Sequence, residues 1–158
     1  MLTIVLLALS MVLISPVKTI TKETYTSHME LELVNPGIRW VSEEGILQIR
    51  DSYWSGTYKG TLGRKGTYEG WVSVSINLKT GEGTLSENWL ITITKGRSQG
   101  TLAGSNRGKI TMPLISGTFV GTHGTGEFEG VQIMGLWEGF HPDLTHVVVE
   151  AEGTIKYP

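Results

Sequence analysis

The chain has 158 residues, a typical length for one domain, and it contains no cysteine, so no disulfide can hold it together. Its net charge is -2 and its 13 basic residues are scattered, whereas a nucleic-acid partner requires clustered Lys and Arg. These values exclude a disulfide-stapled scaffold and argue against nucleic acid as a partner.

The N-terminal segment is apolar. Residues 2–14 carry no charge, and Pro16 and Lys18 follow them. This run suits the core of a signal peptide better than a membrane span, which needs about 20 residues. We therefore expect residues 1–19 to be a signal peptide or an uncleaved membrane anchor, and residues 20–158 to be a single domain that is secreted or displayed at the cell surface. Membrane contact is expected only through residues 1–19, and in an anchor Lys18 and Lys22 would favour a cytoplasmic domain.

The first half of the remaining chain alternates as β-strands do. Apolar residues share one face within residues 24–34, 67–78 and 84–94, and residues 46–62 have the composition of a long strand or a hairpin. Glycine and polar clusters predict turns at 35–37, 79–83 and 95–100, and residues 40–45 are expected to form a short connection of about one helical turn.

The second half continues the pattern. We expect a short strand at 101–104, a turn at 105–108, and a strand edge, bulge or loop at Pro113, which cannot donate to a sheet. Residues 141–143 (HPD) break the chain, and 145–157 form the most regular strand. The whole chain contains eight or nine predicted strands and no helix longer than two turns.

Glycine recurs inside these strands, most densely in residues 116–130 (SGTFVGTHGTGEFEG). Regularly repeated bends at glycine curl a sheet until it closes, and short loops make neighbouring strands antiparallel. The sequence therefore predicts an all-β fold, a closed antiparallel barrel of eight (eight to nine) strands. A barrel of about eight strands either fills its interior with side chains or holds one small ligand.

The last third of the chain resembles a known superfamily. Residues 117–121 (GTFVG) are followed by 124–131 (GTGEFEGV), and the last strand ends in 152–155 (EGTI). This pattern is similar to that of the allene oxide cyclase and dirigent barrels, including their prokaryotic members. The resemblance implies an eight-stranded antiparallel barrel that often forms trimers and holds an apolar ligand in its lumen. It covers residues 115–157 well and 46–110 only in general style, and it carries no catalytic residue over to this chain.

Glu87 is the candidate catalytic residue, because it shares a predicted face with Leu85, Trp89 and Ile91. Inside a barrel its pKa would rise, and it would need a partner such as Arg50 or a water molecule. A carboxylate of this kind can act as a general acid or base, or orient the polar end of a ligand. Two alternatives stay open: the faces are inverted, or Glu87 pairs structurally with a cation.

Aromatic and polar residues supply the other candidates. The five tryptophans are spread over many strands, where they can line a pocket, fill the core or form a subunit interface. We take as candidate ligand-binding residues Arg50, Tyr53, Glu87, Trp89 and His123.

Two further patterns are interpreted as structural. Residues 96–100 (GRSQG) match Gly-x-Ser-x-Gly, and Asp143 and His146 follow in the order of a hydrolase triad, but no helix is expected after Ser98. His141, Asp143 and His146 could offer ligands to a metal, yet no second cluster completes a coordination shell, so we expect a polar loop. No metal and no cofactor is predicted.

Three functions are compatible with these observations. The first is binding of a small apolar ligand in the lumen without assured catalysis, the second is a lumen isomerase or cyclase that uses a pocket carboxylate, and the third is a structural or assembly protein that acts through the barrel faces. The chain is expected to form a homo-oligomer, either a trimer or a dimer.

Overall fold

The computed structural model describes residues 21–94 and 98–158, and these residues form nine strands and one short 3-10 turn. The predicted signal peptide or anchor, residues 1–19, lies outside the described residues. The elements are β1 (Thr21–Asn35), β2 (Ile38–Val41), β3 (Ile46–Gly60), β4 (Gly63–Asn77), β5 (Glu82–Ile93), β6 (Gly100–Thr111), β7 (Leu114–Gly124), η1 (Gly126–Phe128), β8 (Gln132–Phe140) and β9 (His146–Tyr157).

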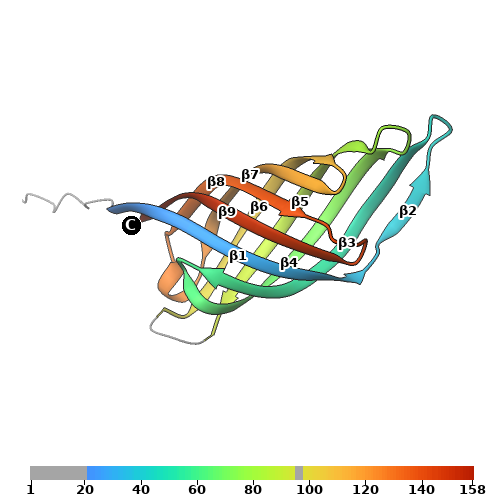
Figure 1. The fold of residues 1–158 in the computed structure, drawn as a ribbon. Helices are drawn as coiled ribbons and strands as arrows, with labels where there is room; N and C mark the ends of the chain where they lie inside the picture. Colours follow the sequence, from blue (N-terminus) through green and yellow to red (C-terminus); the bar gives the residue numbers. More distant parts are fainter. Residues whose placement is uncertain (1–20, 95–97) are drawn as a thin grey trace, which may run out of the picture.

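Eight of the strands close into an antiparallel barrel, as the sequence predicts (Figure 1). The strand order is β1-β9-β8-β7-β6-β5-β4-β3, and the pairing of β1 with β3 closes the ring, with Met29 opposite Tyr58. The ninth strand, β2, pairs only with β3 and lies outside the ring. We expected a connection at this point. Residues 38–41 instead add an edge to β3, because the turn at Gly37 folds them back along it.

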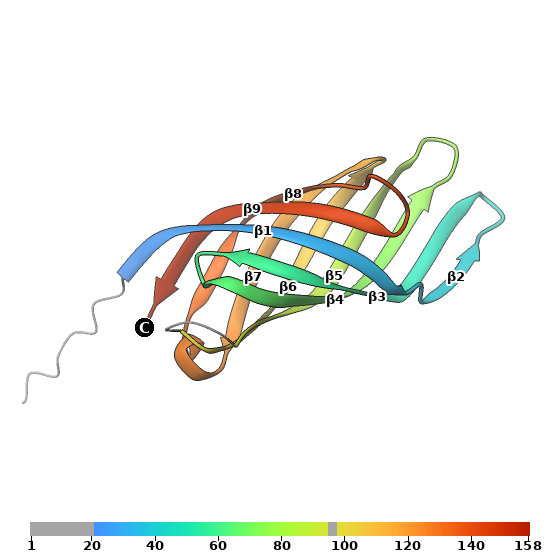
Figure 2. The same ribbon diagram turned by 60° about the horizontal axis from the view of Figure 1, so that its bottom comes forward.

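The two ends of the barrel differ. The start of β1, the C-terminus and η1 lie at one end, and the hairpin of β2 and β3 projects at the other (Figures 1 and 2). The end near the termini is packed with large buried side chains: Tyr25, Tyr58, Leu102, Ile133 and Ile155 are each at most 2% exposed. Burying side chains of this size stabilises a fold by about 1.5–3 kcal/mol each, so this end is the hydrophobic core.

Interior glycines make room for two tryptophans. A Cβ on Gly104 would overlap the indole of Trp89, and a Cβ on Gly108 would lie 2.5 Å from Cζ2 of Trp137. Residues 105–108 therefore do not form the predicted turn: they continue β6, and their glycine marks a position that an aromatic ring from another strand fills. The chain reverses at Met112 and Pro113, which form the turn between β6 and β7.

Candidate functional site

A cavity of about 240 Å³ lies inside the barrel. Apolar side chains from strands all around the ring form most of its wall, among them Leu31, Trp54, Val74, Leu85, Ile115 and Val149. The cavity reaches the surface at the β2 end, because Met112 and Leu144 line it and are also 41% and 77% exposed. It is a blind pocket with one mouth, and the hydrophobic core closes the other end.

A polar cluster interrupts the apolar wall at the inner end of the cavity. Val72 on β4, Glu87 on β5 and Asn106 on β6 are register partners, so their side chains lie at one level of the barrel. The Asn106 Nδ2 group donates a hydrogen bond to Glu87 Oε2 at 2.6 Å, and it lies 3.4 Å from the hydroxyl of Tyr68. The alternation of β5 therefore places Glu87 on the inner face.

Gly70 creates the space for the Glu87 carboxylate. It lies opposite Trp89 on the neighbouring strand, and a Cβ built on it would overlap Glu87 Oε1. Any residue other than glycine at this position would displace the carboxylate. The cradle on β4 and the Asn106 amide on β6 together fix the position of the carboxylate from both sides.

The environment changes the acidity of this cluster. Burial raises the pKa of Glu87 to about 7, because a charged carboxylate loses its hydration there; hydrogen bonds with Tyr68 and Asn106 favour the charged form and limit the rise. Burial also raises the pKa of Tyr68, and the neighbouring Glu87 raises it further. Part of the Glu87 side chain is open to the cavity, so a bound molecule can reach it. A group of this acidity exchanges protons near neutral pH.

Two buried polar atoms near Glu87 find no hydrogen-bond partner within residues 21–94 and 98–158. They are Asn106 Oδ1 and Trp89 Nε1. Buried polar atoms are nearly always paired, since an unpaired one costs about 1–3 kcal/mol. Trp89, a predicted site residue, is 3% exposed and stacks on Tyr68 with the ring centroids 6.4 Å apart. Trp89 is not among the residues that line the 240 Å³ cavity, so this predicted ligand-binding residue lies in the core beside it.

Arg50 and Tyr53, two of the predicted ligand-binding residues, lie on the outer face. Arg50 is exposed and lies over the ring of Trp40, 5.9 Å from its centroid, while the hydroxyl of Tyr53 donates to Glu69 Oε1 at 2.6 Å. A bulge at Asp51, with φ 54°, separates the inner residues Ile49 and Ser52. This extra residue keeps both side chains outside, so Arg50 does not partner Glu87.

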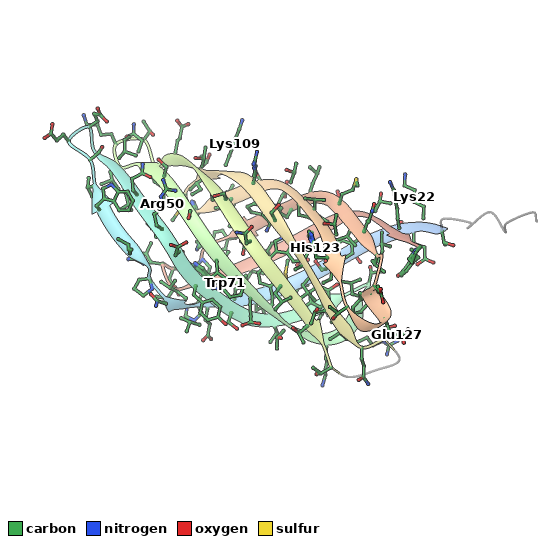
Figure 3. The ribbon with its side chains drawn as sticks, turned by 180° about the vertical axis from the view of Figure 1, so that it is seen from behind. Lys22, Arg50, Trp71, Lys109, His123 and Glu127 are labelled. Atoms are coloured by element: carbon green, nitrogen blue, oxygen red, sulfur yellow. The ribbon has the colours of Figure 1, made fainter. Side chains whose placement is uncertain are left out.

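His123 also lies outside the barrel, as Figure 3 shows together with Arg50. Simple alternation from Phe119 and Gly121 would point it inward. The register between β6 and β7 shifts at this point, because Ala103 pairs with His123 and Gly104 pairs with Gly121. The extra residue, Thr122, exchanges inside and outside, so the predicted lumen contact of His123 is corrected to a surface position.

His141 lines the mouth of the cavity, although the sequence pointed only to a polar loop. Its ring meets Trp54 edge-on with the centroids 5.6 Å apart, and its Nδ1 group lies 3.1 Å from the carbonyl oxygen of His146. Burial lowers the pKa of His141. The alternation of β8 could have indicated this position, since Trp137 and Gly139 face inward and His141 is next in the same register.

The metal and hydrolase patterns have structural explanations. The hydroxyl and the backbone N–H of Thr145 both donate to Asp143 Oδ1, and these bonds together with a hydrogen bond to the His146 side chain lower the pKa of Asp143. No group of three or more metal-ligating side chains is found in the described part of the chain. Residues 95–97 of the Gly-x-Ser-x-Gly match lie outside the described residues, and a strand, β6, follows Ser98 and Gln99.

Comparisons with known proteins do not suggest a function, so the function is inferred from the fold and the cavity. No known family matches the chain, and no curated protein does either. Within residues 21–94 and 98–158, no helix is long and apolar enough to cross a membrane.

Proposed function

We propose that this barrel binds a small apolar ligand in its lumen, with a polar group of the ligand at the Glu87 cluster. One observation carries the proposal: the apolar cavity ends at a polar cluster in which the Glu87 side chain is partly open to the cavity. Ligand pockets are typically apolar with a few convergent polar groups of this kind.

The volume limits the ligand. A cavity of about 150 Å³ accommodates benzene, so the 240 Å³ here suits a compound of roughly ten non-hydrogen atoms. The walls offer aromatic contacts through Trp54 and Trp137. Naphthalene is therefore a suitable first probe, because it fills the space and has no polar group.

Calorimetric titration of the full chain with naphthalene tests the proposal. We expect one binding site, and we expect Val74→Phe to weaken binding at least tenfold, because the larger side chain occupies part of the cavity. Val120→Phe is the matched control, since Val120 is 40% exposed on the outer face of β7. Absence of binding, or equal affinity in the Val74 and Val120 variants, would contradict a lumen site.

A second candidate function is an isomerase or cyclase in which Glu87 transfers a proton. The pKa of Glu87 near 7 favours it, because an acid-base catalyst works best when its pKa is close to the working pH. In this version a reaction rate would follow the ionisation of Glu87, and Glu87→Gln would abolish turnover while ligand binding persisted. A rate profile over pH that Glu87→Gln leaves unchanged would rule out this role.

The remaining parts of the proposal rest on the sequence and on the fold class. Secretion or tethering through residues 1–19 is supported by the apolar run alone, and the mass of the mature chain from its native host tests it. The closed eight-stranded barrel supports the proposed relation to the allene oxide cyclase and dirigent barrels. A dimer or trimer, or an assembly role, is supported by Val120, Met134 and Leu136, which are 40–58% exposed on β7 and β8.

A further inference from the structure

The Nδ1 group of His141 hydrogen-bonds to the backbone of His146, and Nε2 makes no side-chain or backbone hydrogen bond within the described part of the chain. Because a carbonyl oxygen can only accept, the Nδ1 group must donate its hydrogen to the carbonyl of His146. In the neutral ring this makes Nε2 an acceptor. The lowered pKa of His141, caused by burial, favours that neutral form at neutral pH. The mouth of the cavity therefore carries a hydrogen-bond acceptor that a bound molecule can meet.

A second acceptor lies at the inner end. Asn106 donates through Nδ2 to Glu87, and its own Oδ1 is buried away from the cavity. The Glu87 side chain is partly open to the cavity, and its carboxylate accepts hydrogen bonds when it is ionised. A ligand carboxylate at this place would be repelled by the Glu87 charge, and the cation in the cavity lining, Arg39, belongs to β2 at the other end. The inner end is thus suited to a neutral donor, and an apolar wall separates it from the His141 acceptor at the mouth.

Strand β6 runs from the level of Asn106 at the inner end of the cavity to the turn beside His141 at the mouth, so its length gives the distance between the two ends. The backbone N–H of His141 donates to the carbonyl of Pro113 in the turn that follows β6. Met112, in the same turn, is six residues beyond Asn106, about 20 Å along a strand at roughly 3.3 Å per residue. A strand tilt of about 40° reduces this to roughly 15 Å along the barrel axis. One small polar group cannot reach both acceptors.

We infer that the cavity takes an elongated, largely apolar molecule with a hydroxyl group at each end, one donating to the Glu87 carboxylate and the other to His141 Nε2. This inference rests on the proposed lumen site and assigns His141 as a specificity-determining residue for it. The central part of the ligand is apolar and contacts the aliphatic and aromatic wall. Fatty-acid-like or other anionic ligands are disfavoured at the inner end.

Four rigid compounds of similar size test the inference by calorimetric titration of the full chain at neutral pH. They are naphthalene, 2-naphthol, 6-methoxy-2-naphthol and 2,6-dihydroxynaphthalene. Each satisfied acceptor is expected to raise the affinity about twofold to tenfold, the usual net effect of one hydrogen bond. The dihydroxy compound should therefore bind most tightly. The methoxy compound should bind like 2-naphthol, because its second oxygen cannot donate.

His141→Phe should lower the affinity for 2,6-dihydroxynaphthalene to that for 2-naphthol, since phenylalanine keeps the ring against Trp54 and removes the acceptor. His123→Phe, on the outer surface, is the matched control and should leave all four affinities unchanged. If the His141 variant does not fold, the comparison of the methoxy and dihydroxy compounds on the unmodified chain decides the question.

The outcomes separate this inference from the proposed function. Binding of naphthalene with equal affinity for all four compounds would overturn the two-ended ligand and leave the lumen site in place. Equal affinity of the methoxy and dihydroxy compounds would overturn the role of His141 as an acceptor. If none of the four compounds binds, both the inference and the proposed lumen site are overturned.

Discussion

Replacing Glu87 by glutamine should change how stability depends on pH. Burial raises the pKa of Glu87 from its ordinary value of 4.5 to about 7, so the folded chain binds a proton that the unfolded chain releases between these values. The free energy of unfolding then falls as pH rises from about 4.5 to about 7, because the folded state holds more protons in this window. Glutamine has a similar shape, stays neutral and lacks this dependence.

The magnitude follows from the same two values. Each pH unit between them corresponds to about 1.4 kcal/mol, so ionised Glu87 lowers the free energy of unfolding by about 3 kcal/mol above pH 7. The total free energy of unfolding of natural domains is about 5–15 kcal/mol, so the contribution of Glu87 is a large part of it. We expect Glu87→Gln to be about 3 kcal/mol more stable than the natural chain at pH 8, and to match it closely near pH 4.5.

Urea unfolding at several pH values between 5 and 8 measures this difference. The control is Glu82→Gln, which removes one carboxylate from the exposed start of the same strand. It should not reproduce the pH-dependent gain. A Glu87→Gln effect that is constant with pH, or that grows as pH falls, would refute the conclusion that Glu87 is buried among apolar walls.

Three further changes test the packing and the surface. Gly70→Ala should destabilise the fold by about 1–3 kcal/mol, as overpacking does. The loss should shrink in a Glu87→Ala background, because the added Cβ then meets no carboxylate and only the contact with Tyr68 Cε1 at 3.2 Å remains; urea unfolding of both pairs measures it. Gly104→Ala should cost more, since its Cβ would overlap the backbone carbonyl of Val120 as well as the Trp89 indole, and Trp89→Phe should recover only the part due to the indole. Hydrogen bonds with Glu150 and Glu30 raise the pKa of His28, so its contribution to stability is present below pH 6.5 and is lost as pH rises through the raised value. The cost of His28→Gln should accordingly shrink between pH 6 and pH 9, and an NMR titration of the natural chain should place the pKa of His28 above 6.5.

Strand alternation was sufficient to predict the barrel wall. Residues 67–78, 84–94 and 145–157 alternate so regularly that their inner faces, including Glu87 and Trp89, follow from the sequence. The recurrent glycines also predicted closure of the ring. These features succeed because the burial of one face acts at every second residue, and a regular pattern of this kind leaves little freedom in the register.

The predictions from the sequence were wrong where a strand contains a local irregularity. The bulges at Asp51 and Thr122 each insert one residue and exchange the two faces beyond it, which put Arg50, Tyr53 and His123 outside. The residues of one strand alone do not predict such a bulge, because it depends on how the partner strand pairs with them. Asn106 was missed for a related reason: a polar residue between glycines resembles a turn, whereas here an aromatic ring from another strand fills the space above Gly108.

Glu87 is difficult to explain as a purely structural residue. It makes the fold less stable at neutral pH, it requires glycine at position 70 and an amide at Asn106 to hold it, and hydrophobic side chains could fill the same level of the barrel. A buried ionisable group that costs stability is expected where function uses it, because residues that break the local rules concentrate at functional sites. The closed end of the same barrel, packed with tyrosine and aliphatic side chains, leaves a cavity of only about 20 Å³, so this chain can fill most of its interior. The proposed binding of a ligand in the lumen would account for both the cavity and its carboxylate.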